Sequence, residues 1–419
     1  MQICIFEDKK FDNLYPLTYM RPVFQLKCGH TLLVEKILRN FKDVKTSYIV
    51  RDYLEALMKE KLGALNVNNI VALKEDDVLF INGRLLYIDI KIDLNGAEEA
   101  GVSNGDIVYA RVKKENVAKF GSGNTEQLLA DIKANIANKD FSAYLVEWPW
   151  NLVQNNPKAI EDDFKFINKG GVIEGKLSPQ AVIYGDKSKV YIAKNAEIQP
   201  FVTIDTTGGP IIIDEDVVVF PYTRIEGPNA TGKATQLFGA NIRTGTAIGP
   251  VCRVGGEVED SIFHAYSNKY HDGFLGHAYV CEWVNLGALT TNSDLKNDYS
   301  NVSLYIKGEL MDSKDNKVGS FIGDHTKTSI GTFLNTGTIA GIMSNLVGSG
   351  GVLPKYIPSF VWFLNNRFFK GYGLRSMVET AKIAMSRRKK TMSAEEEKLF
   401  QYLYALTKED RTYWIKKKS

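Results

Sequence analysis

Residues 267–293 read SNKYHDGFLGHAYVCEWVNLGALTTNS, and Phe274, Val280 and Leu286 recur in this stretch every six residues. A period of six fits neither an α-helix, with 3.6 residues per turn, nor a β-strand, whose side chains alternate. It is typical of a parallel β-helix, a coil in which short strands joined by tight corners form each rung. We therefore expect this stretch to form rungs of such a coil, with one small or aliphatic side chain pointing inward from each face.

The same six-residue period recurs over a long part of the chain, and segment 228–245 is its largest predicted interruption. A sustained period of six predicts a left-handed parallel β-helix. Such coils commonly associate as trimers with sites in the clefts between subunits, so we expect a homotrimer. The other residues that keep the period are Ile192, Ile198, Ile204, Ile213, Val219, Ile225, Ile248 and Val254.

The N-terminal part of the chain alternates predicted strands and helices. Segments 1–6, 46–52 and 78–88 are apolar and predict buried strands, whereas 31–40 and 52–63 have the spacing of helices. This alternation favours a Rossmann-like α/β domain with a mainly parallel sheet. Ligands of such sheets bind at the carboxyl ends of the strands, where the loop after the first strand and the turn after the third would lie.

The chain divides into three predicted regions. We expect an α/β domain at 1–168, a left-handed β-helix at 169–352 and a C-terminal helical tail at 353–419. Within the first region a turn at 122–124 should precede a helix. In the tail, Ser393 should cap a helix whose first turn is rich in glutamate.

Composition excludes several classes of protein. The 419 residues carry a net charge of +3, which gives no electrostatic reason to expect nucleic acid as a partner. The N-terminus has no apolar signal segment, and no apolar run is long enough to span a membrane. The four cysteines form no CxxC pair. We therefore expect a cytoplasmic protein without a nucleic-acid or membrane partner.

Three short motifs near the N-terminus carry a resemblance to a known family. They read PLTYMRP at 16–22, CGHTLL at 28–33 and NGR at 82–84, and their layout is similar to the start of the sugar nucleotidyltransferases. The resemblance implies that an NTP and a sugar 1-phosphate bind here, with Mg²⁺ for nucleotidyl transfer. The candidate nucleotide- and phosphate-binding residues are Arg21, Lys27, Asn82, Gly83 and Arg84.

The resemblance is incomplete where that family carries its chemistry. The family has a glycine-rich loop whose N–H groups cradle a triphosphate, and here residues 7–10 read EDKK. The family's lysine falls on Val23, and its magnesium-binding aspartate falls on Arg84. An arginine at this position either binds phosphate directly or marks the loss of transfer chemistry.

Residues 267–290 resemble the acetyltransferase segment of the GlmU-like family, whose members acetylate glucosamine 1-phosphate and then uridylylate it. The resemblance places His271 on the family's catalytic histidine and implies acetyl-CoA as co-substrate. Three positions depart from it: Cys281 replaces a glycine, Glu259 lies near the place of a sugar-phosphate-binding lysine, and 292–300 differs from the family's next segment. Further substrate- or acetyl-CoA-binding candidates are Phe274, Asn285, Ala288, Lys269, His277 and His325.

The chemistry of the acetyl transfer suits a histidine. An amino sugar arrives as an ammonium ion and attacks a thioester only after losing a proton, which a histidine with a pKa near about 6.5 can remove. Backbone N–H groups of the coil would stabilise the oxyanion. A structural role for His271, and a zinc site made by His264, His271 and His277 across subunits, are alternatives, and no metal ligand is assigned.

These observations predict an enzyme of nucleotide-sugar synthesis, of the kind that makes UDP-N-acetylglucosamine. The β-helix would acetylate glucosamine 1-phosphate or a related amino-sugar phosphate, and the N-terminal domain would transfer a nucleotidyl group to the sugar 1-phosphate. A regulatory sugar-nucleotide-binding protein, a single-activity nucleotidyltransferase and a zinc enzyme of the γ-carbonic-anhydrase type are alternatives. The basic run 387–390 is usually a solvated helix end, but beside a coenzyme A site it would contact phosphate.

Overall fold

The computed structural model describes residues 1–119 and 125–417, so the turn expected at 122–124 and the last two residues of the tail lie outside it. Within these ranges, no helix is both long and apolar enough to cross a lipid bilayer. The described chain forms two compact units. Unit 1 comprises 1–14, 20–26 and 31–148, and unit 2 comprises 15–19, 27–30 and the chain from 149 onward.

Unit 1 is built on a mixed six-stranded sheet in the order β2-β1-β3-β5-β4-β6. Strand β1 (Gln2–Phe6) pairs in parallel with β2 (Thr46–Ile49) and β3 (Val78–Asn82), as the apolar segments predicted. Strands β1 and β3 are buried along their whole length. The other strands are β4 (Glu99–Ser103), β5 (Asp106–Val112) and β6 (Asn138–Asp140).

Short helices connect the strands of unit 1. Helices α1 (Leu33–Leu38) and α2 (Asp52–Leu62) fall where the sequence predicted them. The others are η1 (Lys9–Leu14), η2 (Val23–Gln25), η3 (Ala64–Asn66), α3 (Ile70–Leu73), α4 (Lys114–Val117) and α5 (Thr125–Asn135).

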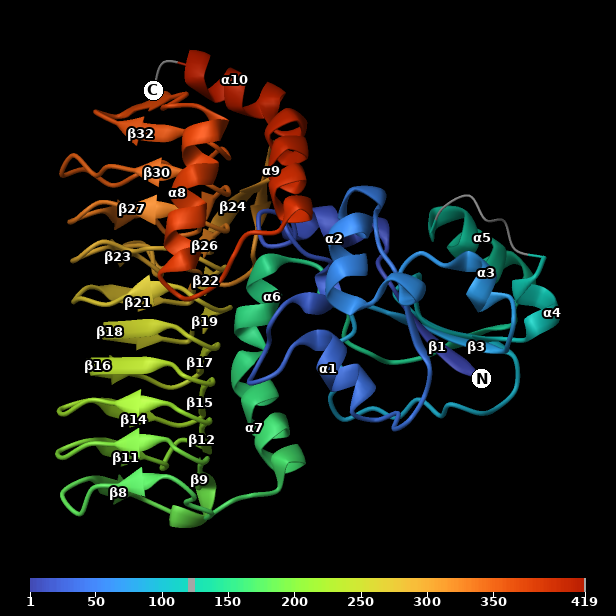
Figure 1. Ribbon diagram of the computed structural model, residues 1–419, viewed down its shortest axis with the longest axis horizontal. Helices are drawn as coiled ribbons and strands as arrows, with labels where there is room; N and C mark the ends of the chain where they lie inside the picture. The colour runs from blue at the N-terminus through green and yellow to red at the C-terminus, as the bar shows by residue number, and fades with distance from the viewer. Residues whose placement is uncertain (120–124, 418–419) are drawn as a thin grey trace. The chain divides into compact units, whose positions relative to one another are not determined.

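Unit 2 is a parallel β-helix, as the six-residue period predicted (Figure 1). Its rungs have three faces. The first face contains β7 (Lys176–Leu177), β10 (Glu197–Ile198), β13 (Val218–Val219), the first halves of β16 (Gln236–Ile242) and β18 (Arg253–Glu259), β20 (Asn268–Lys269), β27 (Lys327–Thr328), β30 (Asn345–Leu346) and β32 (Trp362–Leu364), which pairs with β33 (Arg367–Phe369).

The other two faces continue each rung. The second face contains β8 (Val182–Tyr184), β11 (Thr203–Asp205), β14 (Arg224–Glu226), the second halves of β16 and β18, β21 (Phe274–Gly276), β23 (Thr291–Asn292) and β28 (Phe333–Leu334). The third contains β9 (Val190–Ile192), β12 (Ile211–Ile213), β15 (Asn229–Thr231), β17 (Thr246–Ile248), β19 (Ile262–Phe263), β22 (Tyr279–Val280), β26 (Phe321–Ile322), β29 (Ile339–Ala340) and β31 (Tyr356–Ile357); the short η4 (Lys187–Lys189) precedes it.

The six-residue period arises because each face contributes one inward side chain to the coil's core. Ile192, Ile198 and Ile204 lie on three successive faces and are all buried in one apolar cluster. On the rung of the opening stretch the expected register was wrong by one residue. Leu275, not Phe274, points into the core, because β21 aligns Leu275 with the inward Val258 of β18.

The predicted interruption at 228–245 was also wrong. Strands β15 and β16 run through it and β17 follows it directly. A bulge of β16 relative to β18 lies between Phe238 and Asn241, and the inward residues Leu237 and Ile242 on either side of it are five residues apart rather than six, which hides the period. Gly239 lies within the bulge with a φ of +52°, where a residue without Cβ is favoured. The coil is interrupted instead after β23, by an excursion that holds the antiparallel hairpin β24 (Ser303–Ile306) and β25 (Glu309–Asp312).

Helices cover two faces of the coil. Helix α7 (Asn156–Ile167), which follows α6 (Pro149–Gln154), packs Ile160 against the outer side chains Ile212, Ala230 and Ala247 of the third face. Helix α8 (Leu374–Ser386) runs beside the first face, and α9 (Ala394–Leu406) and α10 (Lys408–Lys416) end the chain (Figure 1). The predicted cap is confirmed, since Ser393 and Glu396 form a capping box at the start of α9.

Candidate active site in the coil

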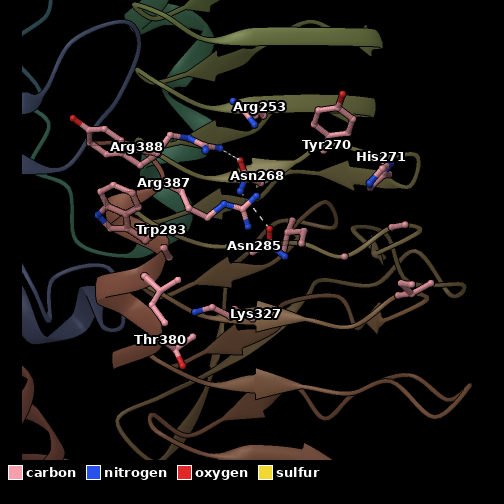
Figure 2. Close-up of a pocket in the computed structure, with 17 residues that line it drawn as sticks. Arg253, Asn268, Tyr270, His271, Trp283, Asn285, Lys327, Thr380, Arg387 and Arg388 are labelled. Atoms are coloured by element: carbon pink, nitrogen blue, oxygen red, sulfur yellow. Dashed lines mark hydrogen bonds between the residues drawn. The ribbon is translucent and has the colours of Figure 1, made fainter. Parts of the chain in front are cut away.

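A cavity of about 530 Å³ lies between the first face of the coil and helix α8, and we call it the ladder pocket (Figure 2). The coil contributes Arg253, Tyr266, Asn268, Tyr270, His271, Trp283, Asn285, Gly287, Ala288 and Lys327. Helix α8 and the residues after it contribute Thr380, Ile383, Ala384, Arg387 and Arg388. The pocket therefore joins three of the predicted site residues, namely His271, Asn285 and Ala288, with two members of the basic run.

Four polar residues of the first face form a ladder along one wall of this pocket. Arg253 pairs with Asn268, Asn268 with Asn285 and Asn285 with Lys327, each one rung further along the coil. Asn268 donates through Nδ2 to Asn285 Oδ1 at 3.3 Å. Because side chains alternate along a strand, the neighbours of these residues point into the core while the ladder points outward.

The pocket carries excess positive charge, since its lining includes Arg253, Lys327, Arg387 and Arg388 and no carboxylate among the described residues. Arg388 Nη2 donates to Asn268 Oδ1 at 2.9 Å, and its buried Nε has no hydrogen-bond partner among the residues the structure describes. Burial, and then the nearby charges of Arg253 and Arg387, lower the pKa of Arg388. A bound anion would relieve this repulsion, so the pocket is suited to phosphate groups.

Lys327 lies at the junction of the ladder pocket with a smaller cavity of about 260 Å³ that His325 and Trp362 line. Its Nζ donates to the carbonyl oxygen of His325 at 2.9 Å. Burial lowers the pKa of Lys327 to about 8. The predicted binding residue His325 thus lies beside the ladder pocket, and its ring stacks on Trp283 with centroids 6.1 Å apart.

His271 occupies the corner between the first and second faces, directly after β20. Its side chain is exposed, and its ring meets the edge of the Tyr270 ring at a centroid distance of 4.9 Å. Tyr270 continues an aromatic stack of Phe220 and Phe238 along the first face. Figure 2 shows His271 and Tyr270 at one end of the ladder pocket and Arg388 and Trp283 at the other, so an extended ligand would reach both.

The three histidines of the zinc alternative occupy three different corners of the same rung. His264 follows β19 and lies 3.2 Å from Glu282, His271 follows β20, and His277 follows β21. His277 Nδ1 is 2.8 Å from Asp294 Oδ2, and its Nε2 is 3.5 Å from Asp260. Spacings of seven and six residues equal one face of the coil, so they separate these side chains within one chain. Among residues 1–119 and 125–417, no three histidine, cysteine, aspartate or glutamate side chains converge on a metal site.

Phe274 and Lys269, like His277 and His325, are predicted binding residues that do not line the ladder pocket. Phe274 is on the second face, where its N–H donates to Thr291 Oγ1 at 3.3 Å. Lys269 points into the coil, 1% exposed, and its Nζ donates to the carbonyl oxygens of Gly255 at 2.9 Å and His271 at 3.2 Å. Burial lowers the pKa of Lys269 to about 8. Its ammonium therefore ties two corners of the coil together beneath His271.

The buried Lys269 makes stability depend on pH in a defined direction. Its pKa is about 8 in the folded chain and 10.5 in the unfolded chain, so the unfolded state binds more protons between these values. The penalty for burying the charge is complete below the lower value and disappears as the pH rises towards the higher one. Between about pH 7.5 and 9.5 we expect the unfolding free energy to gain roughly 2 kcal/mol from this group.

Denaturant titrations of the wild type and Lys269→Met at the two pH values would measure this gain. The useful quantity is the change with pH, because the substitution also removes two hydrogen bonds at both pH values. The variant should lack the extra gain, and equal pH dependence in the two proteins would contradict a buried ammonium.

The pocket residues that the sequence did not single out are of two kinds, outward residues of the first face and aromatic residues at the corners. Arg253, Asn268 and Lys327 point outward at matching positions of different rungs. Counting from the inward residues would identify these positions only if every rung had the same number of residues. The excursion after β23 separates Asn285 from Lys327 by many residues and breaks that count. Tyr266 and Trp283, whose rings stack with centroids 4.4 Å apart, occupy equivalent corners of successive rungs.

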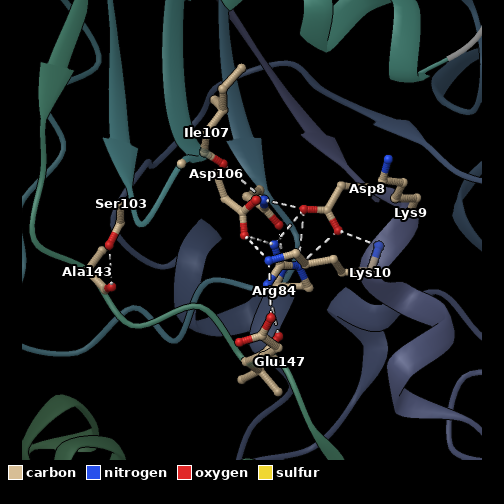
Figure 3. Close-up of polar contacts among 12 residues, drawn as sticks. Asp8, Lys9, Lys10, Arg84, Ser103, Asp106, Ile107, Ala143 and Glu147 are labelled. Carbon is tan, nitrogen blue, oxygen red and sulfur yellow. Dashed lines mark hydrogen bonds and ion pairs between the residues drawn. The ribbon is translucent and has the colours of Figure 1, made fainter. Parts of the chain in front are cut away.

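In unit 1 the predicted site residue Asn82 ends strand β3, and Gly83 and Arg84 follow it. Figure 3 shows Arg84 beside Asp8 of the loop that follows β1. Arg84 is 1% exposed and donates to Asp8 through Nε and Nη2, and to Asp106 through Nη2. Asn82 Nδ2 donates to Asp8 Oδ2 at 2.9 Å. The structure therefore joins these residues in a buried ion-pair network.

The other predicted phosphate-binding residues lie elsewhere. Arg21 is buried, and its carbonyl oxygen accepts from Arg51 Nη2 at 3.0 Å. Lys27 belongs to unit 2, where its N–H donates to Tyr279 Oη at 2.9 Å and its Nζ donates to the His30 carbonyl. Gly83 lets the chain pass close to Phe24, because a Cβ there would lie 3.0 Å from that ring.

A second cavity, of about 370 Å³, opens in unit 1 at the carboxyl ends of β1 and β2. Its lining is acidic, with Glu7, Asp8, Asp52, Glu55 and Glu126 against Lys9 and Arg51. Glu7 is 3% exposed and receives a hydrogen bond from Arg51. The cavity occupies the place where a sheet of this kind binds its ligand.

Comparison with known proteins relates both units to transferases. The profile of a family described as sugar nucleotidyl transferase matches residues 3–172. A bifunctional sugar-1-phosphate nucleotidylyltransferase/acetyltransferase of Sulfurisphaera tokodaii is 24% identical over 300 residues, covering 66% of this chain and 68% of that protein. The bifunctional protein GlmU of Acidithiobacillus ferrooxidans is 35% identical over 94 residues, 22% of this chain and 21% of the relative's length. A solved UDP-N-acetylglucosamine acyltransferase of Francisella novicida superposes with a TM-score of 0.30 and 15% identity, over 56% of this chain and 77% of that one.

Proposed function

We propose that this chain is a bifunctional transferase of the GlmU-like kind and that its coil transfers an acetyl group from acetyl-CoA to an amino-sugar 1-phosphate. Unit 1 would transfer a nucleotidyl group between an NTP and the sugar 1-phosphate, as in the nucleotidylyltransferase/acetyltransferase relative. The four cysteines, which lack a disulfide-framework pattern, favour a cytoplasmic setting.

The observation that carries the acetyl transfer is the ladder pocket. It places a histidine at one end and arginines at the other, with a carboxylate-free lining between them. Coenzyme A carries a pyrophosphate and a 3′-phosphate, which match Arg253, Arg387 and Arg388 in charge. The stacked rings of Tyr266 and Trp283 offer a flat surface beside these cations for the adenine.

The proposed reaction needs two proton transfers and one acyl transfer. A ring nitrogen of His271 removes one proton from the ammonium of the amino sugar. The freed amine attacks the thioester carbonyl carbon, a C–N bond forms, and the C–S bond breaks. The second proton lost from the nitrogen passes to the departing thiolate, so that the products are the neutral amide and the coenzyme A thiol. The exposed position of His271 at the pocket's end leaves its ring accessible to such a substrate.

The two arginines after α8 can be tested through the affinity for acetyl-CoA. We expect Arg387→Ala and Arg388→Ala each to raise the KM for acetyl-CoA about 10-fold or more with a smaller change in kcat, because each removes a charge-assisted contact. Thiol release from acetyl-CoA in the presence of glucosamine 1-phosphate measures both constants. Arg375→Ala is the matched control, since Arg375 is an exposed residue of α8 outside the pocket. Unchanged KM values for acetyl-CoA in both variants would show that these arginines do not bind coenzyme A and would contradict the proposed site.

We propose a homotrimer whose subunits meet along the corner on which His271 lies, so that His271 lines a cleft between them that stays open to substrate. Phe201, Tyr222, Leu289 and Ile330 occupy this corner on other rungs, and each is more than half exposed. An apolar strip of this kind along a rigid edge is typical of a subunit interface. Light scattering should give a mass about three times 46.9 kDa, and a monomeric mass would contradict the proposal.

The Mg²⁺ that the nucleotidyltransferase resemblance implies does not fit the residues of unit 1. The position expected to hold its aspartate ligand is Arg84, and the nearby carboxylates of Asp8 and Asp106 both accept hydrogen bonds from this guanidinium. A guanidinium has no lone pair to offer a metal ion. No step of the nucleotidyl transfer is therefore assigned to Mg²⁺.

A further inference from the structure

Asp8 lies in the loop just after β1, and donors of the protein itself occupy the acceptor positions of its carboxylate. Oδ1 accepts from Arg84 Nε at 2.9 Å and from the Lys10 N–H at 3.2 Å. Oδ2 accepts from Arg84 Nη2 at 2.7 Å and from Asn82 Nδ2 at 2.9 Å. A carboxylate has about four lone-pair positions, so the protein itself uses all of those on Asp8.

Asp106, in the turn that begins β5, is neutralised in the same way (Figure 3). Its Oδ2 accepts from Arg84 Nη2 at 2.8 Å and from Lys10 Nζ at 2.9 Å, and Lys10 Nζ also donates to Glu147 at 3.1 Å. Burial opposes ionisation of Asp106, but the contacts with Lys10 and Arg84 hold its pKa below the ordinary value. Two side-chain cations thus lie among three carboxylates.

The loop after β1 provides a second, independent observation. A glycine-rich loop would offer its N–H groups to a phosphate, whereas here the Lys9 N–H donates to Glu126 Oε1 at 3.2 Å and the Lys10 N–H to Asp8. The protein's own carboxylates therefore occupy the donors that a triphosphate would use. A metal-complexed triphosphate would meet negative charge at this loop.

We infer that Arg84 and Lys10 take the place of a divalent cation in unit 1, and that this unit binds a sugar nucleotide without Mg²⁺. The identity of the ligand class rests on the proposed nucleotidyltransferase function. The guanidinium and ammonium contact Asp8, Asp106 and Glu147 and offset two of their three negative charges, so these carboxylates are held together without a metal ion.

The full-length protein tests this inference directly. Binding of UDP-N-acetylglucosamine, UDP-glucose and dTDP-glucose is measured by calorimetry in excess EDTA and again in excess MgCl₂. We expect at least one of these sugar nucleotides to bind, with dissociation constants that agree within about 2-fold in the two buffers. A difference of about 10-fold between the buffers would correspond to about 1.4 kcal/mol of metal-dependent binding free energy. A loss of about 10-fold or more in EDTA overturns the inference, and so does a failure of all three to bind in either buffer.

Substitution of Arg84 gives a readout that does not depend on the nucleotide. Arg84→Asp would place a third carboxylate beside Asp8 and Asp106, and we expect it to gain one Mn²⁺ site by electron paramagnetic resonance titration relative to the wild type. Arg84→Lys keeps the positive charge and should gain none. If Arg84→Asp fails to fold, the Mn²⁺ titration of the wild type is the test. A Mn²⁺ site in the wild type that is lost in Asp106→Asn would overturn the inference.

Acetyl transfer measured in the same preparation separates this inference from the proposed function. Metal-dependent nucleotide binding with intact acetyl transfer refutes the inference and leaves the function of the coil standing. Metal-free binding without acetyl transfer supports the inference and refutes the function proposed for the ladder pocket.

Discussion

His271→Ala should lower the kcat of acetyl transfer by about 10²–10⁴-fold, the range that a positioned general base contributes. The physical reason is that the amine is protonated when it arrives, and the pocket lining offers no carboxylate that could take the proton instead. The KM for acetyl-CoA should change little, because the arginines lie at the other end of the pocket (Figure 2).

Thiol release with acetyl-CoA and glucosamine 1-phosphate measures this loss, and the split between kcat and KM distinguishes a base from a binding residue. Asp272→Ala is the control, since Asp272 is the exposed neighbour of His271 on the same corner and does not line the pocket. Full activity in His271→Ala would remove His271 from the mechanism. Equal losses in the two variants would indicate damage to the corner rather than to the chemistry.

Asp8→Ala should lower the unfolding free energy of the protein by about 3–5 kcal/mol, the usual cost of breaking a buried ion pair by removing one partner. Arg84 is 1% exposed, so loss of its bidentate partner leaves a guanidinium in the interior whose remaining contacts include one carboxylate, Asp106, and the Val146 carbonyl. The loss should appear in unit 1, whose central strands β1 and β3 carry Asp8 and Arg84 at their ends.

Hydrogen exchange of the amides in β1 and β3, together with urea titration, measures this effect and locates it. Asp93→Ala is the matched control within unit 1, because Asp93 pairs with Lys91 on the surface, where both side chains are more than half exposed. Surface pairs contribute about 1 kcal/mol or less. Similar destabilisation by the two substitutions would contradict a buried network.

The sequence predicted the coil because its inward residues obey a strict geometric rule, and it failed where that rule is locally broken. Ile192, Ile198 and Ile204 mark three faces of one rung, as their spacing requires. On either side of the bulge after Phe238 the inward residues Leu237 and Ile242 are five residues apart instead of six, so this segment lost its visible period although its strands still pair within the coil. A polar inward residue such as Lys269 hides the phase in the same way, because the pattern is read from apolar side chains.

Part of the site was also within reach of the sequence. His271, Asn285 and Ala288 lie within one short segment, and two successive rungs of the first face bring them to the same pocket. Arg387 and Arg388 lie about a hundred residues later, and only the packing of α8 along the first face places them there. The network of Arg84 with Asp8 and Asp106 likewise joins three separate segments through the order of the strands.

The sequence by itself determined the coil, its repeat and the α/β unit before it, because these depend on local periodicity and on residues close together in the chain. Tertiary structure alone decided which charges meet. Arg388 reaches Asn268 across 120 positions and Arg84 reaches Asp8 across 76. Such contacts are set by how a helix packs on a coil face and by which strands adjoin. No periodicity encodes them, because the distance along the chain between the partners is set by excursions and bulges rather than by a repeat.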